Sequence, residues 1–133
     1  MLRRLLLSLA IIFAATLPTP ASAQANDVET AWRLLDYVAV DYAGAVSGGK
    51  VVSASEYAEM REFSGSVAEK IASLPAKPGK AQLVGESARF KAMIERKAAP
   101  QDVAVAARTL AAHLLSAYPV PLGPKQAPDL SRG

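Results

Sequence analysis

Four acidic side chains could bind a metal ion in this chain: Asp36, Asp41, Glu59 and Glu62. Glu59 and Glu62 are three residues apart, a spacing that lets two carboxylates on one helix share a hard cation such as iron or calcium. Asp36 and Asp41 lie about 140° apart around a helix axis, so they need ligands from other helices to complete a site. The sequence therefore predicts these four as candidate metal ligands, and a solvated helix face is the competing interpretation.

His113 is the only histidine, and it lies at the margin of an apolar helix face, three residues after Leu110. A histidine here could bind a metal or haem, or accept a phosphoryl group. Thr109 and Ser116, four residues before and three after it, are not carboxylates, and no further ligand stands at helical spacing. We therefore expect a boundary residue with one nitrogen in water and no acid beside it.

Enzyme chemistry has no support in the sequence. The chain contains no cysteine, and we find no nucleophile paired with a base and no glycine-rich phosphate loop after a strand. We therefore predict that the protein is not an enzyme and has no cofactor within this chain, and iron is the ion we consider for the four carboxylates.

Residues 1–23 have the order of a secretory signal peptide. Arg3 and Arg4 precede an apolar run over 5–17, two prolines break the run, and Ala21–Ala23 forms an A-x-A cleavage site. The run is too short to cross a hydrocarbon core of about 30 Å as a helix, so an uncleaved anchor is the weaker interpretation. We expect cleavage before Gln24, a periplasmic location and no membrane span in the mature chain.

The charge and the lack of cysteine limit the possible partners. The 133 residues have a net charge of +3, which falls to about +1 when Arg3 and Arg4 are removed with the leader. A near-neutral chain lacks the clustered basic surface that nucleic acid requires. Without cysteine the chain can form no disulfide and attach no haem c.

The mature chain predicts an all-α fold, an antiparallel up-down four-helix bundle over 24–118 followed by a Pro/Gly-rich tail or linker over 119–133. Four segments repeat apolar or small residues at helical spacing. The four predicted faces are Val28, Ala31, Leu35, Val38, Tyr42 and Ala45; Tyr57, Met60, Ser64, Val67, Ile71 and Leu74; Leu83, Ser87, Phe90 and Ile94; and Val103, Ala106, Ala107, Leu110, Leu114 and Ala117.

Capping and breaking residues suggest where these helices begin and end. Asn26 followed by Glu29 predicts the first start, and Gly44, Gly48 and Gly49 are expected to end that helix. Ser53 and Glu56 have the spacing of a capping box. Residues 75–79 (PAKPG) break the chain, and Pro100 suits the first turn of the last helix.

Several strings resemble a known family. Residues 34–46 (LLDYVAVDYAGAV), 49–52 (GKVV) and 56–63 (EYAEMREF) are similar to the exported N-terminal region of bacterial iron permeases of the Ftr type. The resemblance is greatest to members with a cytochrome c segment between this region and the membrane helices. Residues 102–121 also resemble that region, and 127–133 (APDLSRG) resembles the start of the cytochrome part.

The resemblance implies a non-catalytic periplasmic accessory domain of an iron uptake system, which presents iron or docks a redox partner. The implied partners are the membrane permease part and a cytochrome c segment or protein, with haem c only in a downstream segment that this sequence lacks. Position 65 is Gly, so the R-E-x-x-E permease motif that Arg61-Glu62 begins is incomplete. We thus expect a fragment, a truncated reading frame or a stand-alone copy. The alternative function is a metal-independent periplasmic interaction or scaffold module.

Overall fold

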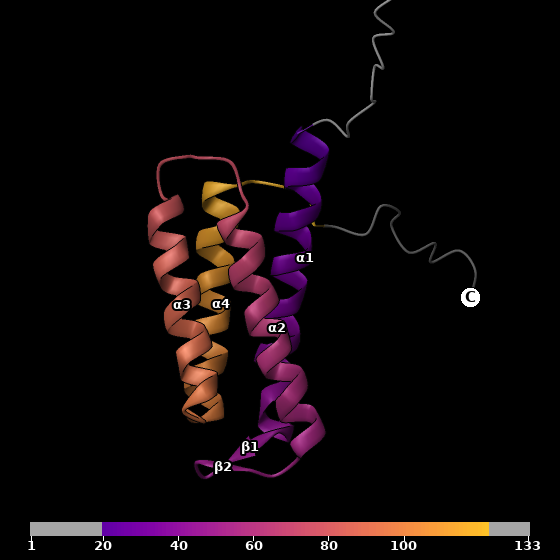
Figure 1. Ribbon diagram of the computed structural model, residues 1–133, viewed down its shortest axis with the longest axis vertical. Coiled ribbons are helices and arrows are strands. Elements are labelled where there is room, and N and C mark those ends of the chain that lie inside the picture. The colour runs from indigo at the N-terminus through magenta and orange to yellow at the C-terminus, as the bar shows by residue number, and fades with distance from the viewer. Residues whose placement is uncertain (1–19, 123–133) are drawn as a thin grey trace, which may run out of the picture.

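The protein is an antiparallel four-helix bundle, and the computed structural model describes residues 20–122. The helices are α1 (Pro20–Asp41), α2 (Ala54–Ala72), α3 (Lys80–Glu95) and α4 (Pro100–Ala117). They alternate in direction, as Figure 1 shows, with a hairpin joining α1 to α2 and short loops making the other two connections. α1 packs against α2 and α4, and α3 packs against the same two helices, which closes the bundle.

The predicted leader and tail lie mostly outside the described residues, which exclude 1–19 and 123–133. The predicted cleavage site, Ala21–Ala23, falls in the first turn of α1. Between residues 20 and 122, no helix is both long enough and apolar enough to cross a bilayer.

The core consists of the four predicted apolar faces. Nearly all of their members are buried, including the small polar residues Ser64 and Ser87, whose hydroxyls donate to carbonyls three residues earlier. Tyr57, Ala106 and Ala117 are only partly buried at its edge. The helical spacing did not predict Val46, Ala111 and Tyr118, which are also buried.

The prediction that α1 begins at Asn26 is wrong, because the helix begins six residues earlier at Pro20. The intervening segment is rich in alanine, which favours helix, and proline is tolerated in the first turn. Asn26 is therefore an exposed residue within α1 and not its N-cap.

The predicted role of Gly48 and Gly49 as helix-ending glycines is also wrong. α1 ends at Asp41 and continues as a 3-10 turn, Tyr42–Gly44, before the strands β1 (Val46–Ser47) and β2 (Lys50–Val51) form an antiparallel hairpin. Both glycines have positive φ, +57° and +73°, which a two-residue hairpin turn of type I′ requires.

The capping box at the start of α2 forms only in part. The Ser53 hydroxyl accepts a hydrogen bond from the Glu56 N–H at 3.3 Å, as predicted. The Ser53 N–H, however, donates to the Ala45 carbonyl at the hairpin. The Glu56 carboxylate instead lies against Gly44, where an added methyl group would come within 2.5 Å of its Oε2.

Three tyrosine hydroxyls join the ends of the bundle. Tyr42 donates to the Ala98 carbonyl at 2.8 Å, and Tyr57 donates to the Ile94 carbonyl at 2.9 Å, so both hold the α3–α4 connection. At the opposite end, Tyr118 donates to the carbonyl of Pro75, just after α2. The acceptors are one carbonyl near the end of α3 and two loop carbonyls, so each hydroxyl ties a helix end or loop to a segment distant in sequence.

Replacing a glycine by alanine should change the free energy of unfolding in opposite directions at the hairpin turn and within helix α2. Gly49→Ala forces a side chain into positive φ and should lower the free energy of unfolding by about 1–2 kcal/mol. Gly65→Ala, in the middle of α2 with nothing within 4 Å of the new methyl group, should raise it by about 0.5–1 kcal/mol. Urea denaturation measures both. Stabilisation by Gly49→Ala would contradict the hairpin turn.

The buried tyrosines should make the fold sensitive to alkali. Burial raises the pKa of Tyr42 above its ordinary 10.0, with a smaller contribution from Tyr57, and burial raises the pKa of Tyr118. The unfolded chain then releases these protons first, so stability is complete below about pH 10 and falls as the pH rises above it. Urea denaturation at several pH values should show that the free energy of unfolding falls less steeply with pH in Tyr42→Phe/Tyr118→Phe than in the unaltered protein. The same slope in both proteins would contradict the raised pKa values of these two tyrosines.

Candidate functional site

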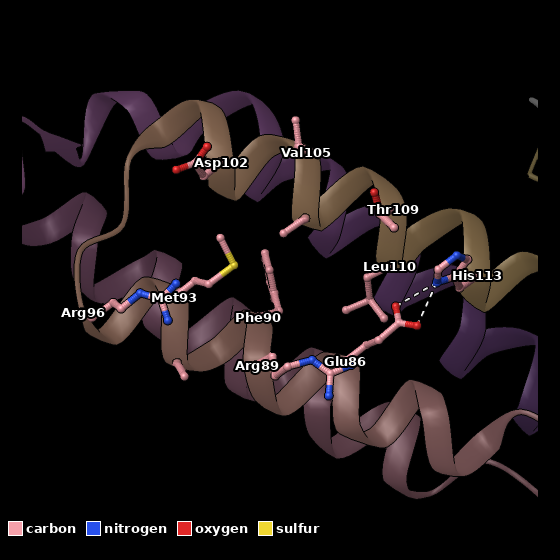
Figure 2. A pocket seen from close by; sticks show the side chains of 12 residues that line it. Glu86, Arg89, Phe90, Met93, Arg96, Asp102, Val105, Thr109, Leu110 and His113 are labelled. Atoms are coloured by element: carbon pink, nitrogen blue, oxygen red, sulfur yellow. Dashed lines mark hydrogen bonds and ion pairs between the residues drawn. The ribbon is translucent and has the colours of Figure 1, made fainter.

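A groove with a volume of about 580 Å³ lies between α3 and α4. Both helices line it with residues at or beside their buried faces: Glu86, Arg89, Phe90, Ala92 and Met93 from α3 with Arg96 at its C-cap, and Asp102, Val105, Ala106, Thr109, Leu110 and His113 from α4. Figure 2 shows this arrangement from close by.

The floor of the groove is apolar. Phe90 and Leu110 are buried beneath it, Met93 is half-buried, and Val105 remains 59% exposed. Because apolar surface is favourably removed from water, such a floor is suited to binding an apolar group.

One end of the groove is closed by a hydrogen-bonded contact between the two helices. His113 Nδ1 lies 2.8 Å from Glu86 Oε1 and 2.9 Å from Oε2, and the Gln82 side chain donates to Glu86 Oε1 at 3.1 Å. The Glu86 side chain is only 14% exposed, whereas that of His113 is 48% exposed. The pair therefore sits at the surface of the bundle, with the carboxylate more deeply placed.

The expectation that His113 has no acid beside it is wrong. Helical spacing considers only neighbours on the same helix, and Glu86 comes from α3. A signal was available in the sequence: two antiparallel helices joined near residue 99 bring residues at equal distance from that point together. Glu86 and His113 are such a pair.

At the other end of the groove, Arg96 at the C-cap of α3 lies across from Asp102 in the first turn of α4 (Figure 2). Arg89, within α3, also lines the groove. Within residues 20–122, neither arginine takes part in an ion pair. The groove is therefore an apolar floor with two arginines at its rim.

The four predicted metal ligands do not meet at one point. Asp41 and Glu59 line a hollow of about 380 Å³ next to the hairpin, together with Glu56. Glu62 lines a different hollow with Arg61 and Lys91, and Asp36 lies exposed on α1. No group of three or more His, Cys, Asp or Glu side chains in the described part of the chain is placed to hold a metal ion. Asp41 and Glu59 are thus the only two candidates that share a hollow.

Charge is divided between the two halves of the bundle. Residues 20–72, which form α1, α2 and the hairpin, carry eight acidic and four basic side chains. Residues 73–122, with α3 and α4, carry seven basic and three acidic side chains. Because α1 and α2 lie on one side of the bundle and α3 and α4 on the other, a nearly neutral chain has an acidic face and a basic face.

A family model for the iron permease-associated 4-helix bundle domain matches residues 19–121, which include all four helices. The chain belongs to this family. A search of curated proteins and a search of solved structures return no match. Membership confirms the resemblance to iron permeases, the four-helix bundle and an association with iron uptake. The cytochrome c segment stays a prediction.

The groove geometry can be tested with a double-mutant cycle in this iron permease-associated domain. Glu86→Ala and His113→Ala should be non-additive, with a coupling of about 0.2–1 kcal/mol at low salt, because the pair is partly exposed. Urea denaturation of the single and double variants gives this value. The control cycle pairs His113→Ala with Glu95→Ala, which lies on α3 outside the groove, and should be additive. Equal coupling energies in the two cycles would contradict a specific contact between Glu86 and His113.

Proposed function

We propose that this chain is an exported accessory domain of an iron permease, which presents iron or docks a redox partner outside the cytoplasmic membrane and catalyses no reaction. The observation that carries the proposal is the family match across all four helices. The leader-like order of residues 1–23 supports export. The membrane permease part is the proposed partner, and a cytochrome c segment or protein is the proposed redox partner.

The acidic half of the bundle supports iron presentation. Asp41 and Glu59 face one hollow, and Glu56 is held there by its close approach to Gly44. Carboxylate oxygens are preferred ligands of hard cations, and a site with few protein ligands binds an ion weakly enough to release it. Such a site suits a protein that passes iron on.

A second candidate function is a metal-independent scaffold for a membrane complex. The groove between α3 and α4 favours it, because its accessible apolar side chains, Ala92, Met93 and Val105, can contact another protein without a metal. The two functions use different faces of the bundle, so they can be separated by experiment.

Iron titration by calorimetry distinguishes them. Ferrous iron under anaerobic conditions and ferric citrate are titrated into protein from the extracytoplasmic fraction, whose mass should correspond to a chain beginning at Gln24. We expect saturable binding that Asp41→Ala/Glu59→Ala weakens by about tenfold or more, since each lost charged ligand is worth about 1.5–3 kcal/mol.

The matched control is Asp36→Ala/Glu62→Ala, which removes the same charge from the same half of the bundle but from outside this hollow. Its binding should stay close to that of the unaltered protein. If the unaltered protein binds neither form of iron, iron presentation is wrong and the scaffold function is favoured. Equal loss in both variants would show a diffuse charge effect in place of a site.

A further inference from the structure

The groove between α3 and α4 has dimensions suited to binding another helix. Its lining runs from Glu86 to Arg96 on α3 and from Asp102 to His113 on α4, a length of about 15 Å at 1.5 Å per residue. This equals about three turns of helix. The groove is open along its length, so it suits a convex rod better than a small molecule, which a pocket would enclose.

The groove leaves apolar side chains accessible to solvent. Phe90 and Leu110 lie under it, and Val105 is one of the few large apolar side chains that the described bundle leaves exposed. α1, α2 and the hairpin pack on the other sides of the bundle and leave this face uncovered. A fifth helix would therefore find the same kind of contact here that the four helices make with one another.

The charges at the rim select the kind of helix. Arg89 on α3 and Arg96 at the C-cap of α3 both line the groove, and both are exposed without an ion pair in the described residues. Glu86 is already paired with His113, and Asp102 lies in the first turn of α4, where the positive helix end offsets its charge. The surrounding half of the bundle is basic. An acidic partner thus meets two available guanidinium groups.

We propose that this groove binds an acidic amphipathic helix of a partner protein, with an apolar face of about three turns on Ala92, Met93 and Val105 and acidic residues against Arg89 and Arg96. The inference rests on the proposed function, because it names the surface by which an accessory domain docks. A flat lipid surface would contact the rim but not the concave floor. A second copy of this chain could occupy the groove only through its acidic α1–α2 face, and measuring self-association tests this alternative.

The test uses two synthetic helical peptides of about 16 residues, long enough to fill a groove of three turns. Both carry one leucine stripe, flanked by glutamates in the first and by lysines in the second. Fluorescence anisotropy should show that the purified protein binds the glutamate peptide at least about tenfold more tightly, and that added salt weakens the binding.

Variants locate the binding. Arg89→Glu/Arg96→Glu and, separately, Val105→Asp should each weaken binding of the glutamate peptide by about tenfold or more. All three positions are exposed, so the fold should persist, and circular dichroism checks it. The matched control, Lys50→Glu/Arg61→Glu, makes the same charge change in the acidic half and should leave the affinity within about twofold.

Several outcomes would overturn the inference: equal binding of the two peptides, no effect of the groove variants, or no binding at all. Sedimentation equilibrium and flotation with phosphatidylglycerol vesicles complete the test. Self-association or vesicle binding that Arg89→Glu/Arg96→Glu abolishes would assign the groove to a second copy or to a membrane instead. If iron binding at the Asp41 hollow persists when peptide binding fails, only the groove assignment is lost.

Discussion

Burial of one apolar face from each helix holds this chain together, because no cysteine is available to form a disulfide. Four faces meet along a shared axis, and small residues such as Ser64 and Ser87 let the helices approach closely. The side chains outside this core lie on the bundle surface or along the seams, the lines where two neighbouring elements meet. The possible functional groups are therefore found at seams: the α3–α4 groove and the hollow beside the hairpin.

The ends of the bundle depend on hydrogen bonds in addition to packing. Tyr42 and Tyr118 bury their rings and Tyr57 does so in part, and all three donate their hydroxyls to carbonyls at a helix end or in a loop. Each of these bonds joins segments far apart in sequence. Tyr42 and Tyr57 contact the α3–α4 connection, and Tyr118 contacts the segment just after α2.

The division of charge gives the two halves of the bundle different capacities. The acidic half attracts cations and carries the hollow of Asp41 and Glu59, whereas the basic half carries the apolar groove with its two arginines. A domain that holds iron on one face and a partner on the other would bring the two together without chemistry of its own. Membership of an iron permease-associated family is consistent with such a task.

The sequence by itself determined the four helices and almost the whole core, because residues such as Leu35, Val67 and Leu114 recur with the helical period, and burial follows that period. It also carried the family resemblance that the comparison confirmed. Only the tertiary structure decided that Gly48 and Gly49 form a hairpin turn and that Glu86 pairs with His113. The physical reason is that periodicity describes one helix at a time, whereas seams, ion pairs across helices and charged faces depend on which helices become neighbours.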